Sequence, residues 1–440
     1  MSDASPERHW SESFGAVAAA RAGEPAWLEA ARKTAIARFV ELGFPTRRHE
    51  EWKYTNPAPI AKIGWTPAAA RSVSRAALDA LGLPLAEGPH LVFVNGSLAA
   101  ELSSLAGLDP ALTLASYGQM LASEPEAIEA HLVRTEPFDD RAFASLARAF
   151  ATDGAFVRIP RDHSAERPIW LVFLSAPGAE PGASHPRFTV VAEASSRATI
   201  FEVHATIGDG AHLSNSLTEI RAGDNAHVDH VKLQLEGDGA IHLGHGAFHA
   251  DRNARVSSTL VSLGASTARH DVVALLDGPG AECAIDGLYV AIDGQHVDCR
   301  TTVDHRQPHG SSRELFKGVL AGKSRGIFNG RVIVRPGAQK TDAQQKNENL
   351  LLGPGAEIDS QPQLEIEADD VKCSHGSTIG QLDEDAVFYL RSRGIGEADA
   401  AAMLTRAFAA QITERVASAA FRERIEARVL ARLFARELPA

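Results

Sequence analysis

The run Lys-Cys-Ser-His-Gly-Ser at positions 372–377 places a thiol and an imidazole two positions apart. Side chains with this spacing on a β-strand face the same way, so Cys373 and His375 can address one ligand. Thiolate and imidazole are common protein ligands of zinc and iron. Val371 shares their face, which indicates that Cys373 points at least partly inward, whereas Gly376 opens the surroundings of His375. The residue chemistry alone leaves a ligand role and a structural role equally open.

The other two cysteines of the chain are expected to be structural. Alternation places Cys299 on the strand face of Val297 and Val303, and Cys283 on the face of Ile285. A free cysteine on an apolar face is usually a small, inert hydrophobic residue. Three scattered cysteines are also too few for a disulfide framework or for a metal site built by this chain alone. Metal or sulfur chemistry would therefore need help from a second chain.

Histidines crowd the middle of the sequence, but their spacing does not favour a metal cluster. His227 and His230 are three positions apart and would face opposite sides of a strand. His245 and His249 could share a face, but no carboxylate stands alongside them. We therefore expect polar, outward-facing positions for His227, His230, His242, His245, His249, His296, His305 and His309.

The segment Gly318–Ser324 is similar to a phosphate-binding loop but does not meet its requirements. Three residues separate the first glycine from Gly-Lys-Ser, where the motif has four, and the following residues are typical of a strand rather than a helix. ATP binding through this segment is not expected.

Three compositional zones must position these residues, and we predict domains at 1–160, 161–382 and 383–440. The middle zone is rich in Val, Ile, Thr and Gly and alternates apolar with polar residues, as strands do. Turn-like tetrads that end in alanine recur in it, several of them about 28 residues apart, which favours a β-solenoid. A β-sandwich is the competing architecture. The tetrads end at Ala198, Ala211, Ala226, Ala254, Ala281, Ala338 and Ala356.

The flanking zones have helical periodicity. Apolar residues from Trp27 to Leu42 recur every three or four positions. The stretch from Pro45 to Asn56 then predicts a surface loop that Trp52 anchors to the core. In the last zone, two apolar ladders predict amphipathic helices that cap the open end of the solenoid or dock a partner, with capping the commoner use. The ladders are Leu404, Phe408, Ile412 and Val416, and then Phe421, Ile425, Val429 and Leu433.

The composition argues against a nucleic-acid or membrane partner. The net charge of −12 disfavours binding to phosphate backbones and anionic lipids. The N-terminal residues lack the apolar core of a signal peptide, and no apolar run is long enough to span a bilayer. We therefore expect a cytoplasmic protein.

Five segments together resemble the SufB/SufD family of iron–sulfur cluster assembly scaffolds. They are long, occur in order and extend from about residue 45 to 415. The segments are Pro45–Thr55, Gly318–Val332, Gln339–Gly353, Asp370–Gly376 and Phe388–Ile395.

The resemblance is to the SufD branch of the family rather than to the SufB branch. In SufB-like chains, the segment that matches 347–353 begins with the scaffold cysteine, whereas this chain has Asn347. The SufB pattern Glu-His-Glu-Ala-Thr is replaced by residues 373–377, with His375 opposite the second Glu. An amide cannot hold iron or persulfide as a thiolate does. The resemblance therefore implies that His375, assisted by Cys373, contributes to a site shared with a SufB-like partner.

The same resemblance implies a mainly β fold. Its core is a right-handed parallel β-helix, flanked by an N-terminal α-rich domain and a C-terminal helical domain. It implies a non-catalytic scaffold that works with a SufB-like chain and a SufC-like ATPase, with ATP hydrolysis on the ATPase. The cofactor would be a nascent cluster or iron, transient and shared with SufB, with none tightly bound by the isolated chain. The residues expected to bind the ATPase are Phe388, Tyr389, Arg391, Arg393, Gly394, Leu404 and Phe408.

Other interpretations stay open at this point. One is a β-solenoid enzyme that acts on polysaccharides, although the Asp residues of the middle zone are dispersed among turns rather than paired. A second is a purely structural or homodimeric partner without a ligand role. A third is a homodimer with a separate duty, such as iron acquisition or flavin handling.

Overall fold

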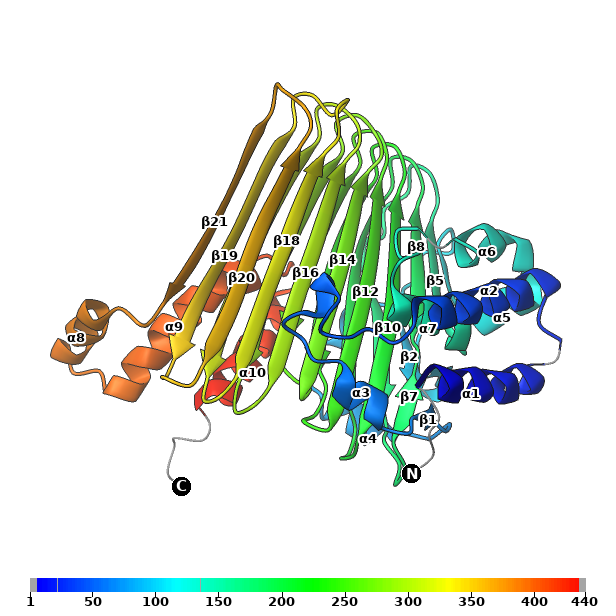
Figure 1. The fold of residues 1–440 in the computed structure, drawn as a ribbon, viewed down its shortest axis with the longest axis horizontal. Helices are drawn as coiled ribbons and strands as arrows, with labels where there is room; N and C mark the ends of the chain where they lie inside the picture. Colours follow the sequence, from blue (N-terminus) through cyan, green and yellow to red (C-terminus); the bar gives the residue numbers. More distant parts are fainter. Residues whose placement is uncertain (1–5, 22, 135, 435–440) are drawn as a thin grey trace.

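The repeat of about 28 residues produces a coil in which each turn adds one strand to each of two sheets. The computed structural model describes residues 6–21, 23–134 and 136–434. His227 pairs with Arg255, 28 positions later, and Asp342 pairs with Lys372, 30 positions later, both in parallel. Figure 1 shows the resulting stack of long strands, with helices at both ends of the chain. The predicted β-solenoid core with helical ends is therefore confirmed.

The first sheet, sheet A, has the strand order β20-β18-β16-β14-β12-β10-β8-β5-β4, with β1 and β7 attached at its side. Its strands are parallel except at the β4–β5 pair. Their bounds are β1 Thr66–Pro67, β4 Thr113–Ser116, β5 Gly154–Ile159, β7 Gly182–Ser184, β8 Arg187–Ala192, β10 His212–Ala222, β12 Ala240–Ala250, β14 Thr267–Leu276, β16 His296–His305, β18 Arg325–Val334 and β20 Glu357–Ile366.

The second sheet, sheet B, has the order β21-β19-β17-β15-β13-β11-β9-β6-β2-β3. Only the β2–β3 pair is antiparallel. Its strands are β2 His90–Val94, β3 Ser97–Leu98, β6 Ile169–Ser175, β9 Arg197–Thr206, β11 His227–Leu235, β13 Arg255–Ser262, β15 Glu282–Ala291, β17 Ser311–Ala321, β19 Asp342–Leu352 and β21 Lys372–Gly380. Both sheets already contain strands before residue 160, namely β2, β4 and β5. The strand positions do not define domains, and the domain boundary at residue 160 stays a prediction.

The alanine-ending tetrads form corners of the coil. Asn225, Asn253 and Gly280 each precede a tetrad alanine and adopt positive φ angles of 57°, 55° and 71°. Asn and Gly tolerate this left-handed conformation best among the common residues. The alanines that follow Asn225 and Asn253, Ala226 and Ala254, are fully buried inside the corner.

The interior between the two sheets is apolar along much of its length. Inward-facing residues of successive rungs stack on one another, for example Ala198, Val228 and Val256 in sheet B. Cys283 and Cys299 belong to this core, with 5% and 0% of their surface exposed. Burial raises the pKa of both thiols. Their predicted structural role is thus confirmed.

N-terminal helices cover part of the outer face of sheet A. Helix α7 packs on β10, and Trp52, in a short 3-10 turn, is buried beside Phe143 of α7, as predicted for the loop anchor. The helices are α1 Pro6–Ala20, α2 Ala26–Leu42, α3 Ala58–Lys62, α4 Arg75–Asp79, α5 Tyr117–Ser123, α6 Pro125–Leu132 and α7 Ala142–Phe150, and the 3-10 turns are Glu50–Trp52, Leu85–Glu87 and Ala100–Leu102.

The C-terminal helices are α8 Glu384–Ser392, α9 Glu397–Thr413 and α10 Ala419–Phe434. The predicted apolar ladders face the outer side of sheet B, where Ile412, Phe421 and Ile425 are fully buried against strand residues such as Val231. The expected capping of the open end is therefore wrong, since α9 and α10 lie along the side of the stack behind sheet B (Figure 1). Among the helices of the described residues, none combines the length and apolar character needed to cross a membrane.

Candidate functional site

The stack ends in a rung that has a neighbour on one side only. Strand β20 pairs with β18 and strand β21 pairs with β19, and each is the last strand of its sheet. We call these two strands the open rung. Their residues are largely half-buried or exposed, whereas the strands in the middle of the stack are largely buried. The open rung therefore presents unpaired backbone donors and acceptors along two strands.

The register places the predicted ligands on the inward face of the open rung. Cys373 lies beside Ala343 and His375 lies beside Gln345 of β19. Ala343 and Gln345 are buried. The structure thus brings Cys373 and His375 to one face, as the spacing predicts, at the uncovered end of the solenoid interior.

The two residues differ in their surroundings. Cys373 is half-buried against an apolar cluster that includes Val334 and Ala343. Burial raises the pKa of the Cys373 thiol, although a hydrogen bond with the Ala343 backbone acts in the opposite direction. At neutral pH this thiol is protonated, so a metal would have to displace its proton. His375 is exposed, which makes its imidazole the more accessible ligand.

Asn347 is an interior residue with complete hydrogen bonding. It is fully buried, and its Nδ2 donates to the Phe316 carbonyl at 3.2 Å and to the Tyr289 hydroxyl at 3.3 Å. Asn349 Nδ2 donates to Asn347 Oδ1 at 2.7 Å. The side chain therefore serves the packing of the last closed rungs. In the register it lies beside Ser377, two residues along β21 from His375.

The segment that follows the open rung exposes several large apolar side chains. Phe388 and Tyr389 of α8 are 72% and 57% exposed. Arg393 stacks over the Tyr389 ring at 5.0 Å, and Gly394 ends the helix with a φ of 84°. Arg391 pairs with Glu397 at 3.1 Å at the start of α9.

The two predicted docking residues on α9 are less accessible. Phe408 is half-buried under the Lys317 ammonium, which lies 4.1 Å from the ring centroid. Leu404 is also half-buried. The accessible apolar surface therefore centres on α8, and the ATPase-binding role of the whole set stays a prediction.

Most of the histidines expected to face outward are buried, so that prediction is wrong for them. His230, His242 and His305 point into the interior and are at most 3% exposed. His245 faces the outer side of sheet A but lies under the N-terminal segment, beside Phe138. His249 is also buried, His227 and His296 are half-buried, and His309 is exposed. The strand alternation gives the face of each residue but does not reveal that helices cover both outer faces.

The interior also holds polar residues that the sequence analysis missed. His204 of β9 and Glu236, at the end of β11, lie beside His242, and Glu202 of β9 contacts His204. All four residues are at most 2% exposed. The missed signal is charge at inward-facing positions, since Glu202 and His204 continue the alternation of Ala198 and Ile200. His204, Glu236 and His242 could hold a metal ion.

A buried carboxyl group lies close to the open rung. Glu314 of β17 accepts a hydrogen bond from Gln345 Nε2 at 3.0 Å, and Gln345 is the strand neighbour of His375. Burial raises the pKa of Glu314 to about 7. Gly330 makes room for Gln345, because a Cβ there would lie 2.2 Å from its Nε2.

Comparisons with known proteins cover most of the chain. The family model described as "SUF system FeS cluster assembly, SufBD core domain" matches residues 173–408, and that of the "SufBD protein N-terminal region" matches residues 15–171. The chain is 33% identical over 401 residues to the iron–sulfur cluster assembly protein SufD of Escherichia coli, covering 90% of this chain and 91% of that protein. It is also 33% identical over 402 residues to an iron–sulfur cluster assembly SufBD family protein of Synechocystis, covering 90% and 88%.

Proposed function

The chain belongs to the SufBD family of iron–sulfur cluster assembly proteins, and from that membership we propose that it is the SufD-like scaffold subunit of a SufBCD-type complex. In this role the chain catalyses no reaction itself. It pairs with a SufB-like chain through the open rung and carries a SufC-like ATPase on its C-terminal helices. Family membership favours this function over the polysaccharide-active alternative.

The observation that carries the proposal is the exposed imidazole of His375 on an unpaired rung. Ile366 and Ile379 on the same rung are 43% and 53% exposed, which is unusual for large aliphatic side chains in strands. An edge of this kind is a template for strand addition by another chain. A SufB-like partner that adds its own strands there would enclose His375 within a joint interface.

The chemistry of the joint site is divided between the two chains. By the resemblance to SufB-like chains, Asn347 stands where those chains have the scaffold cysteine. Its amide is fully used in hydrogen bonds within the core. The thiolate must therefore come from the partner. His375 coordinates incoming iron or the nascent cluster, which is the cargo of the complex rather than a resident cofactor, and imidazole ligation of cluster iron is an established mode. Cys373 assists only after it loses its proton.

Anaerobic cluster reconstitution on the purified three-protein complex tests the role of His375. With His375→Ala, we expect the complex to remain intact and the yield of bound iron and sulfide to fall about tenfold or more, the scale of losing a metal-site group. Ser374→Ala is the matched control, since Ser374 lies on the same strand and faces the other way. A His375→Ala complex that assembles clusters at the wild-type yield would refute the ligand role and leave a purely structural partner.

A second experiment separates the two partner surfaces. The exposed ring of Phe388 makes α8 the expected contact of the ATPase, because exposed apolar patches commonly mark protein interfaces. Phe388→Asp should abolish co-purification with the ATPase while the SufB-like chain stays bound. Val40→Asp introduces the same charge at an apolar residue of α2 that is 46% exposed, and should have no effect. Retention of the ATPase by the Phe388→Asp chain would exclude α8 as the docking element.

The same purification shows whether the chain without its partners is a monomer or a dimer. Without the SufB-like partner, the edges at β20 and β21 can pair with a second copy of this chain. A dimer that dissociates when the SufB-like chain is added would place both contacts on the open rung. A dimer that persists would place the self-contact elsewhere.

A further inference from the structure

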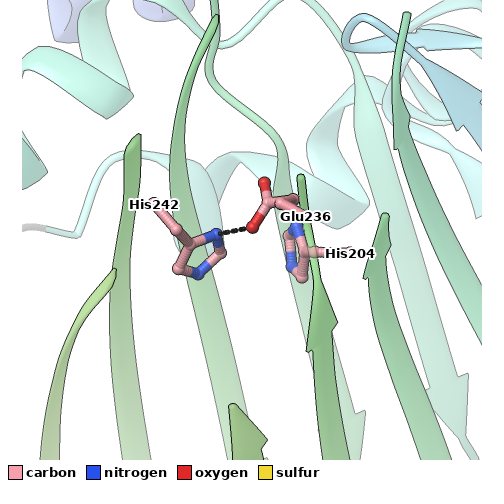
Figure 2. Close-up of side chains that lie close together, drawn as sticks. All are labelled: His204, Glu236 and His242. Atoms are coloured by element: carbon pink, nitrogen blue, oxygen red, sulfur yellow. Dashed lines mark ion pairs between the residues drawn. The ribbon is translucent and has the colours of Figure 1, made fainter. Parts of the chain in front are cut away.

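A cluster of two imidazoles and one carboxylate lies inside the solenoid, several rungs away from the open rung. His204 comes from β9, Glu236 from the corner after β11, and His242 from β12. One potential ligand atom from each residue lies within 4.8 Å of the other two. Figure 2 shows the Glu236 carboxylate turned toward the His242 ring, with His204 beside it. The three side chains therefore converge from β9, the corner after β11, and β12.

The strand alternation fixes these side chains in the interior. His204 shares the inward face of Ala198 and Ile200, and His242 shares that of Ala240. The interior of the coil is apolar along much of its length. Burying polar side chains there costs a large free energy unless each polar group finds a partner. A compensating interaction is required at this point of the interior.

The imidazole of His204 is oriented as a metal ligand would be. Its Nε2 lies 2.6 Å from the Glu202 carboxylate, and its ring stacks on Phe173 with centroids 5.1 Å apart. Its other nitrogen, Nδ1, is buried without a hydrogen-bond partner. Metal-binding histidines characteristically donate one ring N–H to a carboxylate and coordinate through the other nitrogen. Glu202 is thus a positioning residue for His204.

The imidazole of His242 is less well satisfied than that of His204. His242 Nδ1 lies 2.8 Å from Glu236 Oε2, yet neither ring nitrogen makes a hydrogen bond of acceptable geometry. Gln234 Nε2 donates to the same carboxylate at 3.0 Å, which holds Glu236 in place. Two ligands of one metal ion likewise lie close together without a hydrogen bond between them.

The carboxylates of the buried cluster outnumber its ammonium groups. Glu202 and Glu236 supply two carboxylates, whereas Lys232 supplies one ammonium, 2.9 Å from Glu202 Oε1. An uncompensated charge in the interior is strongly unfavourable. A cation beside Glu236 would compensate the carboxylate that no ammonium group faces.

From these contacts we propose that His204, Glu236 and His242 form a buried binding site for one divalent first-row transition-metal ion. Two imidazoles and a carboxylate suit Zn²⁺ or Fe²⁺ better than Mg²⁺ or Ca²⁺, which prefer sites made entirely of oxygen. Ligand bonds of about 2.1 Å in a tetrahedral site place the ligand atoms about 3.5 Å apart. His242 Nδ1 and Glu236 Oε2, which are 2.8 Å apart, would therefore separate slightly around an ion. A water molecule would complete the coordination. This site is independent of the shared site at His375.

Metal content of the full chain tests this site without any partner. The chain should carry Cys373→Ser and His375→Ala, so that the open rung contributes no ligand, and should be expressed in zinc-supplemented medium because the site is enclosed. We expect one tightly held zinc ion per chain by elemental analysis after dialysis. Adding His242→Gln, or Glu236→Gln in a second variant, should lower the affinity at least a hundredfold.

The control is His305→Gln in the same background. His305 is also an inward-facing, fully buried histidine, with Nε2 2.9 Å from Ser312 Oγ, but it lies outside the cluster. This variant should keep the zinc ion. Circular dichroism verifies the fold of each variant, and zinc should raise the unfolding temperature of the parent and the control but not that of His242→Gln.

Anomalous scattering at the zinc edge from crystals of the parent chain gives a direct location. A peak between His204, Glu236 and His242 supports the proposal. The absence of bound zinc, equal binding by the parent and His242→Gln, or a peak elsewhere overturns it. The cluster would then be a polar network balanced by a proton.

Discussion

The closed rungs in the middle of the stack and the open rung at its end have the same alternation of side chains but opposite exposure. His230 of β11 and His375 of β21 both face the solenoid interior, yet His230 is 3% exposed and His375 lies in the open. Each closed strand has a partner on both sides, whereas β20 and β21 have one. A residue's role in this fold therefore depends on whether the next rung belongs to the same chain.

The largest expected loss of unfolding free energy concerns a buried arginine of sheet A and its ion pairs. Arg269, 2% exposed, binds Asp271 at 2.9 Å and Asp298 at 2.8 Å and stacks on Trp52. Arg269→Ala should lower the free energy of unfolding by about 3–5 kcal/mol, because it removes the ion pair of the buried Asp271 and one of the two ion pairs of Asp298. Chemical denaturation measures this value. Arg255→Ala removes an exposed arginine of β13 and should change the free energy of unfolding little. Equal losses of stability in the two variants would contradict the expected difference between buried and exposed positions.

The next prediction concerns pH. Burial raises the pKa of Glu314 to about 7 from its ordinary value near 4.5, so the folded chain holds this proton more tightly than the unfolded chain does. Its contribution to stability is complete below pH 4.5 and is lost as the pH rises through 7. Glu314→Gln should therefore be up to about 3 kcal/mol more stable than the wild type at pH 8 and similar to it at pH 4.

Urea titrations at the two pH values test this difference. Glu365 of the open rung is the control, because its hydrogen bond with Arg331 lowers the pKa of that carboxyl. Glu365→Gln should gain no stability at pH 8. Parallel pH profiles for the wild type and Glu314→Gln would show that Glu314 does not titrate as the buried environment requires.

The two inward-facing histidines themselves provide the third prediction. His230 lies 2.9 Å from both Glu202 and Ser258, so His230→Ala should cost about 1–3 kcal/mol of unfolding free energy. His375→Ala should leave the stability of the isolated chain within about 0.5 kcal/mol, as is usual for surface substitutions. Thermal unfolding of the two variants side by side checks this. A large loss for His375→Ala would mean that the open rung is already closed in the isolated chain, for example by a second copy.

The smallest effect is expected for an exposed ion pair that involves the open rung. Arg331 of β18 pairs with Glu365 of β20 at 2.6 Å, with both side chains more than 40% exposed. Arg331→Ala should cost less than about 1 kcal/mol, because water screens such pairs and holding long side chains costs entropy. Denaturation at low and high salt measures this loss of unfolding free energy. A loss as large as that of Arg269→Ala would show that the exposure of an ion pair does not determine its contribution to stability.

The solenoid fold could be predicted from the sequence because each turn of a solenoid repeats the same corner and strand pattern. The tetrads that end in Ala226 and Ala254 mark corners, and the alternation places Cys299 and Cys373 on their correct faces. The same reasoning failed for His245, which faces outward from its sheet but is covered by residues more than a hundred positions away. It also missed the convergence of His204, Glu236 and His242, since side chains of different rungs meet only once the register is known.

The packing of α10 has a consequence for how the chain is made. Phe421 lies 4.7 Å from the Trp170 ring and 5.0 Å from the Phe201 ring, on the first long strands of sheet B. Ribosomes add about 5–20 residues per second, so the roughly 220 residues between Phe201 and Phe421 take on the order of ten to forty seconds. For most of that time the outer face of Val231 and Leu233 lacks its helical cover. The nascent chain is thus most prone to aggregate after its rungs have formed and before its last forty or so residues emerge.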